Sequence, residues 1–186
     1  MSLIYPSYFP NISSYIVISQ SKSICFEVED NYQKQTFRNR CYIYGANGKL
    51  GLHIPVHYTQ LKRQKTKDIR IDNSTNWKSI HWKSIESAYR TSPFFEFYED
   101  ELAVFYNTSF SSLYAFNKDY FELLLKLVGW KPRLVYTQSY EASIAATDIR
   151  AQIEQKNNTA DVGLKYTQVF EEKNGFIPNL SIIALL

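Results

Sequence analysis

The sequence predicts an α+β protein: one domain over residues 1–186, with a central mixed β-sheet packed by several helices. Short apolar, strand-like segments come first along the chain, helical segments follow, and one strand-like segment, Leu134–Thr137, returns late. In addition, Asn47-Gly48 separates two apolar runs, which is a strong signal for a β-hairpin inside that sheet. Together these observations favour one sheet covered by helices.

The expected strands are short and bounded by turn residues. Pro6 and Pro10 limit the first strand, because proline cannot donate a hydrogen bond to a sheet ladder. The others alternate enough between apolar and polar residues to present one buried face. The segments expected before the late strand are Leu3–Tyr5, Ile24–Val28, Arg40–Tyr44, Leu50–Val56 and Ile69–Ile71.

The clearest helix is expected over Asn76–Thr91. At about 100° per residue, its large apolar side chains gather in one arc and its charged ones lie opposite. Asn76 is suited to cap the first turn, and Pro93 ends the element. The buried arc should consist of Trp77, His81, Trp82, Ile85, Ala88 and Tyr89.

Four further segments are expected to be helical: Ser13–Ser19, Phe94–Tyr106, Ser111–Val128 and Ala142–Gln155. Ser13 or Ser14 could cap the first of them. Gly129 follows the leucine-rich third segment and suits its C-terminal cap. A polar loop, Lys156–Asp161, follows the last segment and is too short to divide the chain into domains.

Composition indicates an ordinary globular protein, with 45% hydrophobic and 21% charged residues. The net charge of +3 is too small to argue for nucleic acid. We expect no membrane span, because no apolar run approaches about 20 residues. We also see no signal peptide, and we expect a cytoplasmic protein with Cys25 and Cys41 as buried, reduced thiols. The oligomeric state is not predicted.

The run Asp30–Cys41 is the most informative part of the chain, because it concentrates hydrogen-bond donors and aromatic rings. Arginine presents a planar fork of donors that suits carboxylate or phosphate. Alternation along a strand would put Arg38 and Arg40 on one face, so both could reach one anion. Lys34 would be a further anchor, and Gln33 and Asn39 could read hydroxyl or amide groups. The run therefore predicts a site for an anionic or polyhydroxylated ligand.

Two residues have both a chemical and a structural interpretation. Asp30 beside the basic run could accept a proton from an amine or a hydroxyl, or it could form a structural ion pair. His81 could take part in the chemistry, or it could be a hydrogen-bonded histidine of the core. Neither alternative is excluded by the sequence.

The sequence predicts neither a metal nor a cofactor. His53 and His57 are four residues apart, but Pro55 interrupts the strand between them, so the helical spacing of metal ligands does not apply. Cys41 follows Arg40, but alternation points the two side chains to opposite faces, which disfavours a catalytic thiolate. There is no Gly-x-Ser-x-Gly motif and no phosphate-binding loop. A covalent nucleophile is therefore not expected.

The order Asp-x-x-x-Lys, Arg-Asn-Arg, Asn-Gly and Leu-x-x-Pro-Val, over Asp30–Val56, resembles the WbqC-like family. Members are often encoded among genes for bacterial surface-polysaccharide (O-antigen) synthesis. Where many relatives carry His-Gln before the first proline, this chain has Ile4-Tyr5. The resemblance covers nearly the whole chain; its other motifs are Pro6–Pro10, Ile69–Asp72, Trp77, His81–Ile85, Ala88–Phe95 and Phe176–Ile182.

The resemblance implies a transferase of surface-polysaccharide biosynthesis that attaches an aminoacyl group, such as glycyl, to an amino sugar. Its partners would be a nucleotide sugar or amino sugar and an activated acyl donor, with no nucleic acid. The implied catalytic residues are Asp30 and His81, and the implied ligand-binding residues are Tyr8, Gln33, Lys34, Arg38, Asn39, Arg40 and Arg90. A non-catalytic module that binds a sugar nucleotide or a partner enzyme is the alternative. A nucleic-acid-binding surface around Lys62–Lys67 is the third hypothesis, and the sequence supports it least.

Overall fold

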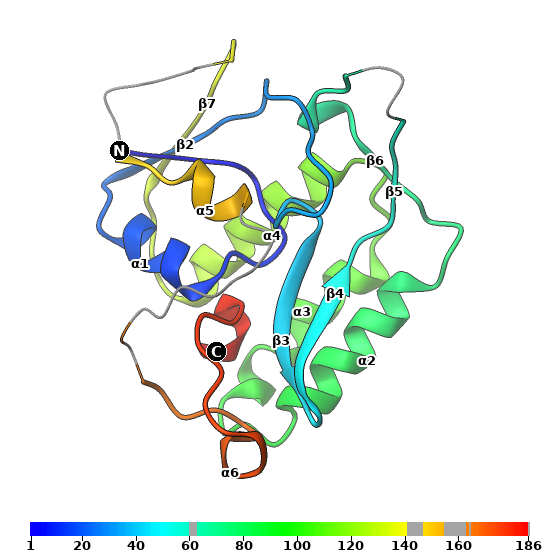
Figure 1. The fold of residues 1–186 in the computed structure, drawn as a ribbon, viewed down its shortest axis with the longest axis vertical. Coiled ribbons are helices and arrows are strands. Elements are labelled where there is room, and N and C mark those ends of the chain that lie inside the picture. The colour runs from blue at the N-terminus through cyan, green and yellow to red at the C-terminus, as the bar shows by residue number, and fades with distance from the viewer. Residues whose placement is uncertain (60–62, 141–146, 155–162, 164, 186) are drawn as a thin grey trace.

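The computed structural model describes residues 1–59, 63–140, 147–154, 163 and 165–185. Its helices and strands confirm the α+β class. Figure 1 shows the parallel strands with α1 on one side of the molecule, and the long β3–β4 hairpin beside α2 on the other. Among the described helices, none combines the length and apolar character needed to cross a membrane.

A four-stranded parallel sheet organises the first side, in the order β7-β2-β1-β8. Its strands are β1 (Ser2–Ile4), β2 (Ser23–Phe26), β7 (Arg133–Tyr136) and β8 (Thr147–Asp148). Helix α1 (Ile12–Ser19) connects β1 to β2. Neither Ser13 nor Ser14 caps this helix: Asn11 does, by accepting a hydrogen bond from the backbone N–H of Ser14 at 3.0 Å.

The antiparallel strands form two separate sheets, so the prediction of one central mixed sheet was wrong in this detail. One pair joins β3 (Arg40–Gly45) to β4 (Gly48–His53), and the other joins β5 (Val56–His57) to β6 (Arg70–Ile71). The turn also differs from the predicted one, because Ala46 and Asn47 connect the closing pair Gly45 and Gly48. Only Gly48 takes a positive φ, of 103°, whereas an Asn-Gly turn of type I′ needs two such residues.

Helix α2 (Trp77–Tyr89) follows the predicted range closely and buries the predicted arc. Trp82 alone of that arc is only partly buried. Asn76 occupies the N-cap position but makes no capping hydrogen bond with its side chain. Trp77 packs edge-on against Phe116 of α4 (Leu113–Leu127), with 5.7 Å between the ring centroids. Ser112 caps α4, and Gly129 ends it at a φ of 69°.

The predicted helix Phe94–Tyr106 is divided in the structure. A 3₁₀ turn, η2 (Phe95–Phe97), comes first, and α3 (Glu99–Asn107) begins after Tyr98. The predicted helix Ala142–Gln155 was also wrong where it is described, because Thr147 and Asp148 form β8 and only α5 (Arg150–Glu154) is helical. Residues 142–146 and the loop 156–161 lie outside the described residues. The remaining elements are η1 (Thr66–Asp68), α6 (Glu171–Asn174) and η3 (Ile182–Leu185).

Candidate functional site

The carboxyl ends of the four parallel strands meet at one edge of the sheet. The chain steps outward from β1 to β2 and later to β7, and then places β8 on the other side of β1, so the strand order reverses between β1 and β8. In open parallel sheets, ligands bind outside the carboxyl ends of the strands at such a switch point. The edge between β1 and β8 is therefore the first place to look for a site.

Charged side chains gather along this edge. Glu27 directly follows β2 and is fully buried, and its Oε1 accepts a hydrogen bond from the Thr137 hydroxyl, just after β7, at 2.9 Å. Arg150, just after β8, lies 3.8 Å from Glu27 Oε2 and donates to both carboxylate oxygens of Asp148. The hydrogen bonds to Asp148 raise the pKa of Arg150 further, so its charge is fixed. Neither Glu27 nor Arg150 was predicted from the sequence, although each comes soon after the end of a strand, where site residues of parallel sheets often lie.

The centre of the edge is an ion pair between Asp30 and Arg38. Arg38 Nη2 donates to Asp30 Oδ2 at 2.6 Å, and the two side chains are 0% and 3% exposed. The Arg38 guanidinium also lies over the ring of Tyr5, just after β1, at 3.8 Å from the centroid. Burial raises the pKa of Asp30, and the charge of Arg38 opposes that effect. The pair that the sequence left open as structural or chemical is thus a buried ion pair.

Oxygen atoms without hydrogen-bond partners among the described residues surround this pair. Asn117 connects the two segments here, because its Nδ2 donates to the backbone oxygen of Arg38 at 2.7 Å and to that of Pro6 at 3.4 Å. Native interiors pair nearly all buried polar atoms, so such a group marks a place for ordered water or for polar groups of a ligand. The atoms are Ser7 Oγ, Asp30 Oδ1, Tyr32 Oη, Asn39 Oδ1, Thr66 Oγ1 and Asn117 Oδ1.

The backbone of the loop after β1 is strained at Phe9. Phe9 is buried and has a φ of 47°, which is a rare conformation for a bulky side chain. Hydrogen bonds fix the chain on both sides of it, from the Tyr8 N–H to the Phe37 oxygen at 2.9 Å and from the Ile12 N–H to the Leu180 oxygen at 3.0 Å. Strain of this kind persists where the surrounding structure imposes it, and it concentrates at functional sites.

The other residues of the basic run lie around the pair. Gln33 and Lys34 are exposed, and Lys34 Nζ is 4.8 Å from the centroid of the Tyr58 ring. Asn39 donates from Nδ2 to the Ile54 oxygen at 2.9 Å. Arg40 is half-buried at the start of β3. Because Arg38 lies outside the strand and is fully buried, the two arginines do not present their side chains together to solvent.

Tyr8 and His81 lie together, but in the core. The Tyr8 hydroxyl is 3.0 Å from His81 Nδ1 and 2.7 Å from the Tyr106 hydroxyl, and all three side chains are buried. Burial lowers the pKa of His81 to about 4, so its ring is neutral at pH 7. This geometry favours the interpretation of His81 as a hydrogen-bonded core histidine. Burial also raises the pKa of the neighbouring Cys41 thiol, which disfavours a thiolate nucleophile there.

Arg90 lies apart from this group. It is 65% exposed and pairs with Glu86 at 2.9 Å and with Glu99 at 3.2 Å. In the basic segment proposed for nucleic acid, Lys65 and Lys67 both pair with Glu29, and Lys62 is outside the described residues. Within the described residues, no three or more His, Cys, Asp or Glu side chains are placed to hold a metal ion.

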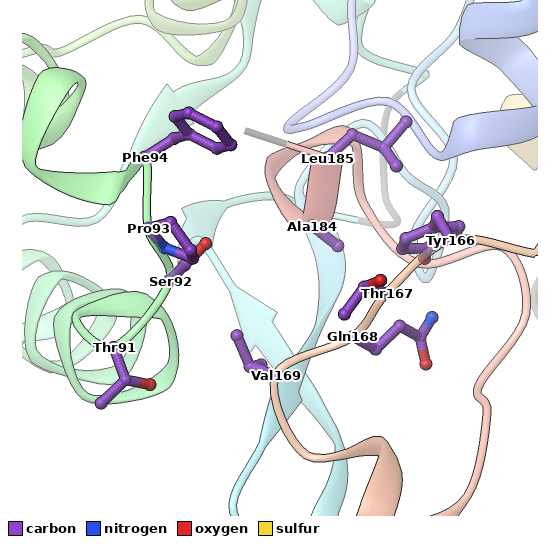
Figure 2. Close-up of a pocket in the computed structure, with 10 residues that line it drawn as sticks. All are labelled: Thr91, Ser92, Pro93, Phe94, Tyr166, Thr167, Gln168, Val169, Ala184 and Leu185. Atoms are coloured by element: carbon purple, nitrogen blue, oxygen red, sulfur yellow. The ribbon is translucent and has the colours of Figure 1, made fainter.

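A pocket of about 550 Å³ opens elsewhere on the molecule. Figure 2 shows that its lining comes from three segments: the loop after α2, the stretch Tyr166–Val169 and the C-terminal turn η3. No charged side chain lines it, and its polar groups are hydroxyls and the Gln168 amide. Its volume is in the usual range for small-molecule sites. This pocket was not predictable from the sequence, because its three segments are far apart along the chain. Its lining residues are Thr91, Ser92, Pro93, Phe94, Tyr166, Thr167, Gln168, Val169, Ala184 and Leu185.

The fold and the site define an α+β protein with a small parallel sheet whose carboxyl edge holds buried acid–arginine pairs. The chain belongs to the WbqC-like protein family, whose sequence model matches residues 5–163. That match confirms the family resemblance drawn from the motifs. It spans the parallel edge, the hairpin and α2.

One relative in Mycobacterium tuberculosis is described as uncharacterized protein Rv1507c. It is 24% identical over 154 residues, which cover 82% of this chain and 66% of the relative. The chain therefore spans just under two thirds of the length of that protein. No solved structure matches the chain.

Proposed function

We propose that the protein is a transferase of bacterial surface-polysaccharide biosynthesis that attaches an aminoacyl group, such as glycyl, to the amine of an amino sugar in the cytoplasm. The family supports the proposal through the setting implied by the resemblance. The carboxyl edge supports it through a carboxylate placed where parallel sheets bind ligands.

The observation that carries the proposal is the state of the Asp30 carboxylate. Arg38 holds Oδ2, while Oδ1 makes no close hydrogen bond among the described residues; the Thr66 hydroxyl lies near enough to the carboxylate to lower its pKa. Burial raises the pKa of Asp30, which makes its carboxylate a stronger base than an exposed one. A substrate ammonium or amine would supply the missing donor to Oδ1. Arg38 is then a positioning residue that fixes the carboxylate and does not grip the ligand.

The proposed reaction needs no covalent intermediate with the protein. Asp30 takes a proton from the sugar ammonium, and the nitrogen lone pair attacks the carbonyl carbon of an acyl thioester or similar donor. The new N–C bond forms while the C–S bond breaks, and the leaving thiolate takes its electron pair. A proton of the attacking nitrogen then passes to the thiolate, so an amide and a thiol result, and Asp30 releases the proton that it took to solvent. Donors fixed in advance stabilise the developing oxyanion.

The remaining residues of the run supply anchors in this proposal. Lys34 is exposed and Arg40 is half-buried, and they would hold a phosphate or carboxylate of the substrates. Gln33 and Asn39 would read hydroxyl or amide groups. The amine must reach Oδ1 past the loop 31–36, where Asn31, Gln33, Lys34 and Gln35 are exposed.

A transfer assay tests the proposal. The purified protein is incubated with a glycyl thioester and a nucleotide-linked amino hexose, and mass spectrometry follows the amide product. Asp30→Asn should reduce the rate at least about 100-fold, since it removes the proton acceptor. Arg90→Ala, which removes an exposed charge outside this group, should keep the rate. Equal rates in the protein and the Asp30→Asn variant would exclude Asp30 as the base.

The pocket in Figure 2 favours a second candidate, a non-catalytic binding module for a sugar nucleotide or a partner enzyme. Its uncharged lining suits the sugar ring, because aromatic faces and hydroxyls bind such rings without charge. Phe94, at its edge, is 61% exposed. In this case Phe94→Ala would weaken sugar binding and Asp30→Asn would not.

A further inference from the structure

The outer face of the β3–β4 hairpin brings together Arg40, which the proposed function uses as an anchor, and several residues that it does not use. In the antiparallel register Arg40 pairs with His53, Tyr42 with Gly51 and Tyr44 with Lys49, and paired residues point to the same face. Cys41 and Ile43 point to the opposite face and are fully buried in the core. Tyr44 lies on the same face as Arg40, but it is fully buried and its hydroxyl donates to the backbone oxygens of Phe170 and Gly175. We call the other residues of that face, Arg40, Tyr42, Lys49, Gly51 and His53, the hairpin platform.

Gly51 forms the floor of the hairpin platform. A Cβ atom at this position would lie 3.3 Å from Tyr42 Cε1 and 3.4 Å from His53 Nε2. The two rings therefore lie against the backbone of Gly51. Lys49 Nζ lies over the Tyr42 ring, 4.1 Å from its centroid. Glycine at this position therefore leaves the space that the two rings occupy, and any side chain there would displace them.

The hairpin platform carries positive charge that no acidic side chain balances. Arg40, Lys49 and His53 make no ion pair with an acidic residue in the part of the chain that the structure describes. Burial lowers the pKa of Lys49. Burial and, second, the charge of Arg40 lower the pKa of His53. Five other surface cations, Lys65, Lys67, Arg90, Lys118 and Lys126, do have acidic partners.

The hairpin platform adjoins the Asp30 site. Tyr42 packs edge-on against Phe37, with 6.0 Å between the ring centroids, and both pack with Tyr5 in one small apolar cluster. Tyr5 in turn lies under the Arg38 guanidinium. A substrate with its amine at Asp30 would thus have a cationic surface next to it for a second, anionic group.

We propose that the hairpin platform binds a phosphate group, as in a sugar phosphate or a nucleotide-linked sugar. Arg40 would offer paired donors to two oxygens, Lys49 would add a point charge, and His53 would become protonated when the anion arrives. The choice of a sugar-linked phosphate rests on the proposed function, but the binding of phosphate itself does not.

Histidine NMR gives the sharpest test, because the chain has only three histidines. The Cε1–H signals are titrated with pH in the absence and presence of pyrophosphate. We expect the His53 midpoint to rise by about one pH unit, since an anion favours the charged ring. The His57 midpoint, on the neighbouring strand β5, should stay constant. Equal movement of both midpoints, or no movement of His53, would overturn the proposal.

Matched variants locate the effect. Arg40→Gln, Lys49→Gln and Gly51→Ala should each weaken pyrophosphate binding about tenfold, and Lys126→Gln, a paired surface cation, should not. Unchanged binding in all three hairpin variants would also overturn the proposal. A sugar 1-phosphate, a nucleoside diphosphate and a free amino sugar then distinguish the source of the phosphate. If the free amino sugar binds and pyrophosphate does not, this inference fails while the proposed function stands.

Discussion

Replacing Arg38 by alanine should lower the free energy of unfolding by about 3–5 kcal/mol, because it leaves the Asp30 carboxylate buried without its counter-ion. The variant also loses the stacking of the guanidinium on Tyr5. Urea denaturation of both proteins at pH 7 measures the difference. If the variant does not fold at all, the loss of stability exceeds the whole free energy of unfolding, which agrees with the prediction.

Two controls separate this effect from the loss of any arginine. Arg90→Ala removes an exposed arginine with two acidic partners and should cost no more than about 1 kcal/mol. The double variant Asp30→Leu with Arg38→Met removes both charges and should recover much of the loss. If Arg38→Ala costs no more than Arg90→Ala, the buried pair does not contribute to stability as described.

Protonation of His81 should destabilise the protein in acid. Burial lowers its pKa to about 4 from an ordinary 6.5, so the unfolded chain binds the proton first as the pH falls. Stability is therefore lost progressively between about pH 6.5 and pH 4, and is fully present only above that range. The difference corresponds to roughly 3 kcal/mol, at about 1.4 kcal/mol per unit.

Urea denaturation across this pH range, in the protein and in His81→Gln, measures the effect. The raised pKa of Asp30 acts in the opposite direction, but it is common to both proteins and cancels in the comparison. The variant should lose about 3 kcal/mol less between pH 7 and pH 4. His57→Gln, at an exposed position, should behave as the parent protein does. An identical pH dependence in His81→Gln would show that His81 does not titrate in this way.

Elements with a strong local pattern were predictable from the sequence. The face of α2 and the end of α4 at Gly129 follow from side-chain spacing and backbone preference. Strand β8 was not predictable, because Thr147 and Asp148 become a strand only by pairing with β1, far away in the sequence. Tyr98 similarly divides a segment whose composition favours one helix.

The site shows the same division. The density of Asp30, Lys34, Arg38 and Arg40 singled out the run that holds the buried Asp30–Arg38 ion pair. Arg38 faces Asp30 and not solvent because the loop 31–36 folds back and brings the two residues together. The conformation of that loop does not follow from its composition. Glu27 and Arg150 were missed because they come together only when β2 and β8 enter one sheet. The hairpin platform requires the exact register of β3 and β4.

The most direct test of the central claim, that Asp30 binds a substrate amine, compares an amino hexose with its N-acetylated counterpart. Each is added to the protein, to Asp30→Asn and to Phe94→Ala, and the thermal unfolding midpoint is recorded. A ligand that binds the folded state raises the midpoint. Phe97→Ala, an exposed aromatic residue that does not line the pocket, serves as the matched control for Phe94→Ala.

The account predicts that the amino sugar raises the midpoint more than the N-acetylated sugar does, and that Asp30→Asn abolishes this difference while Phe94→Ala preserves it. If the difference between the two sugars persists in Asp30→Asn, or is lost only in Phe94→Ala, Asp30 does not bind the amine. Either result would favour the binding module at the pocket.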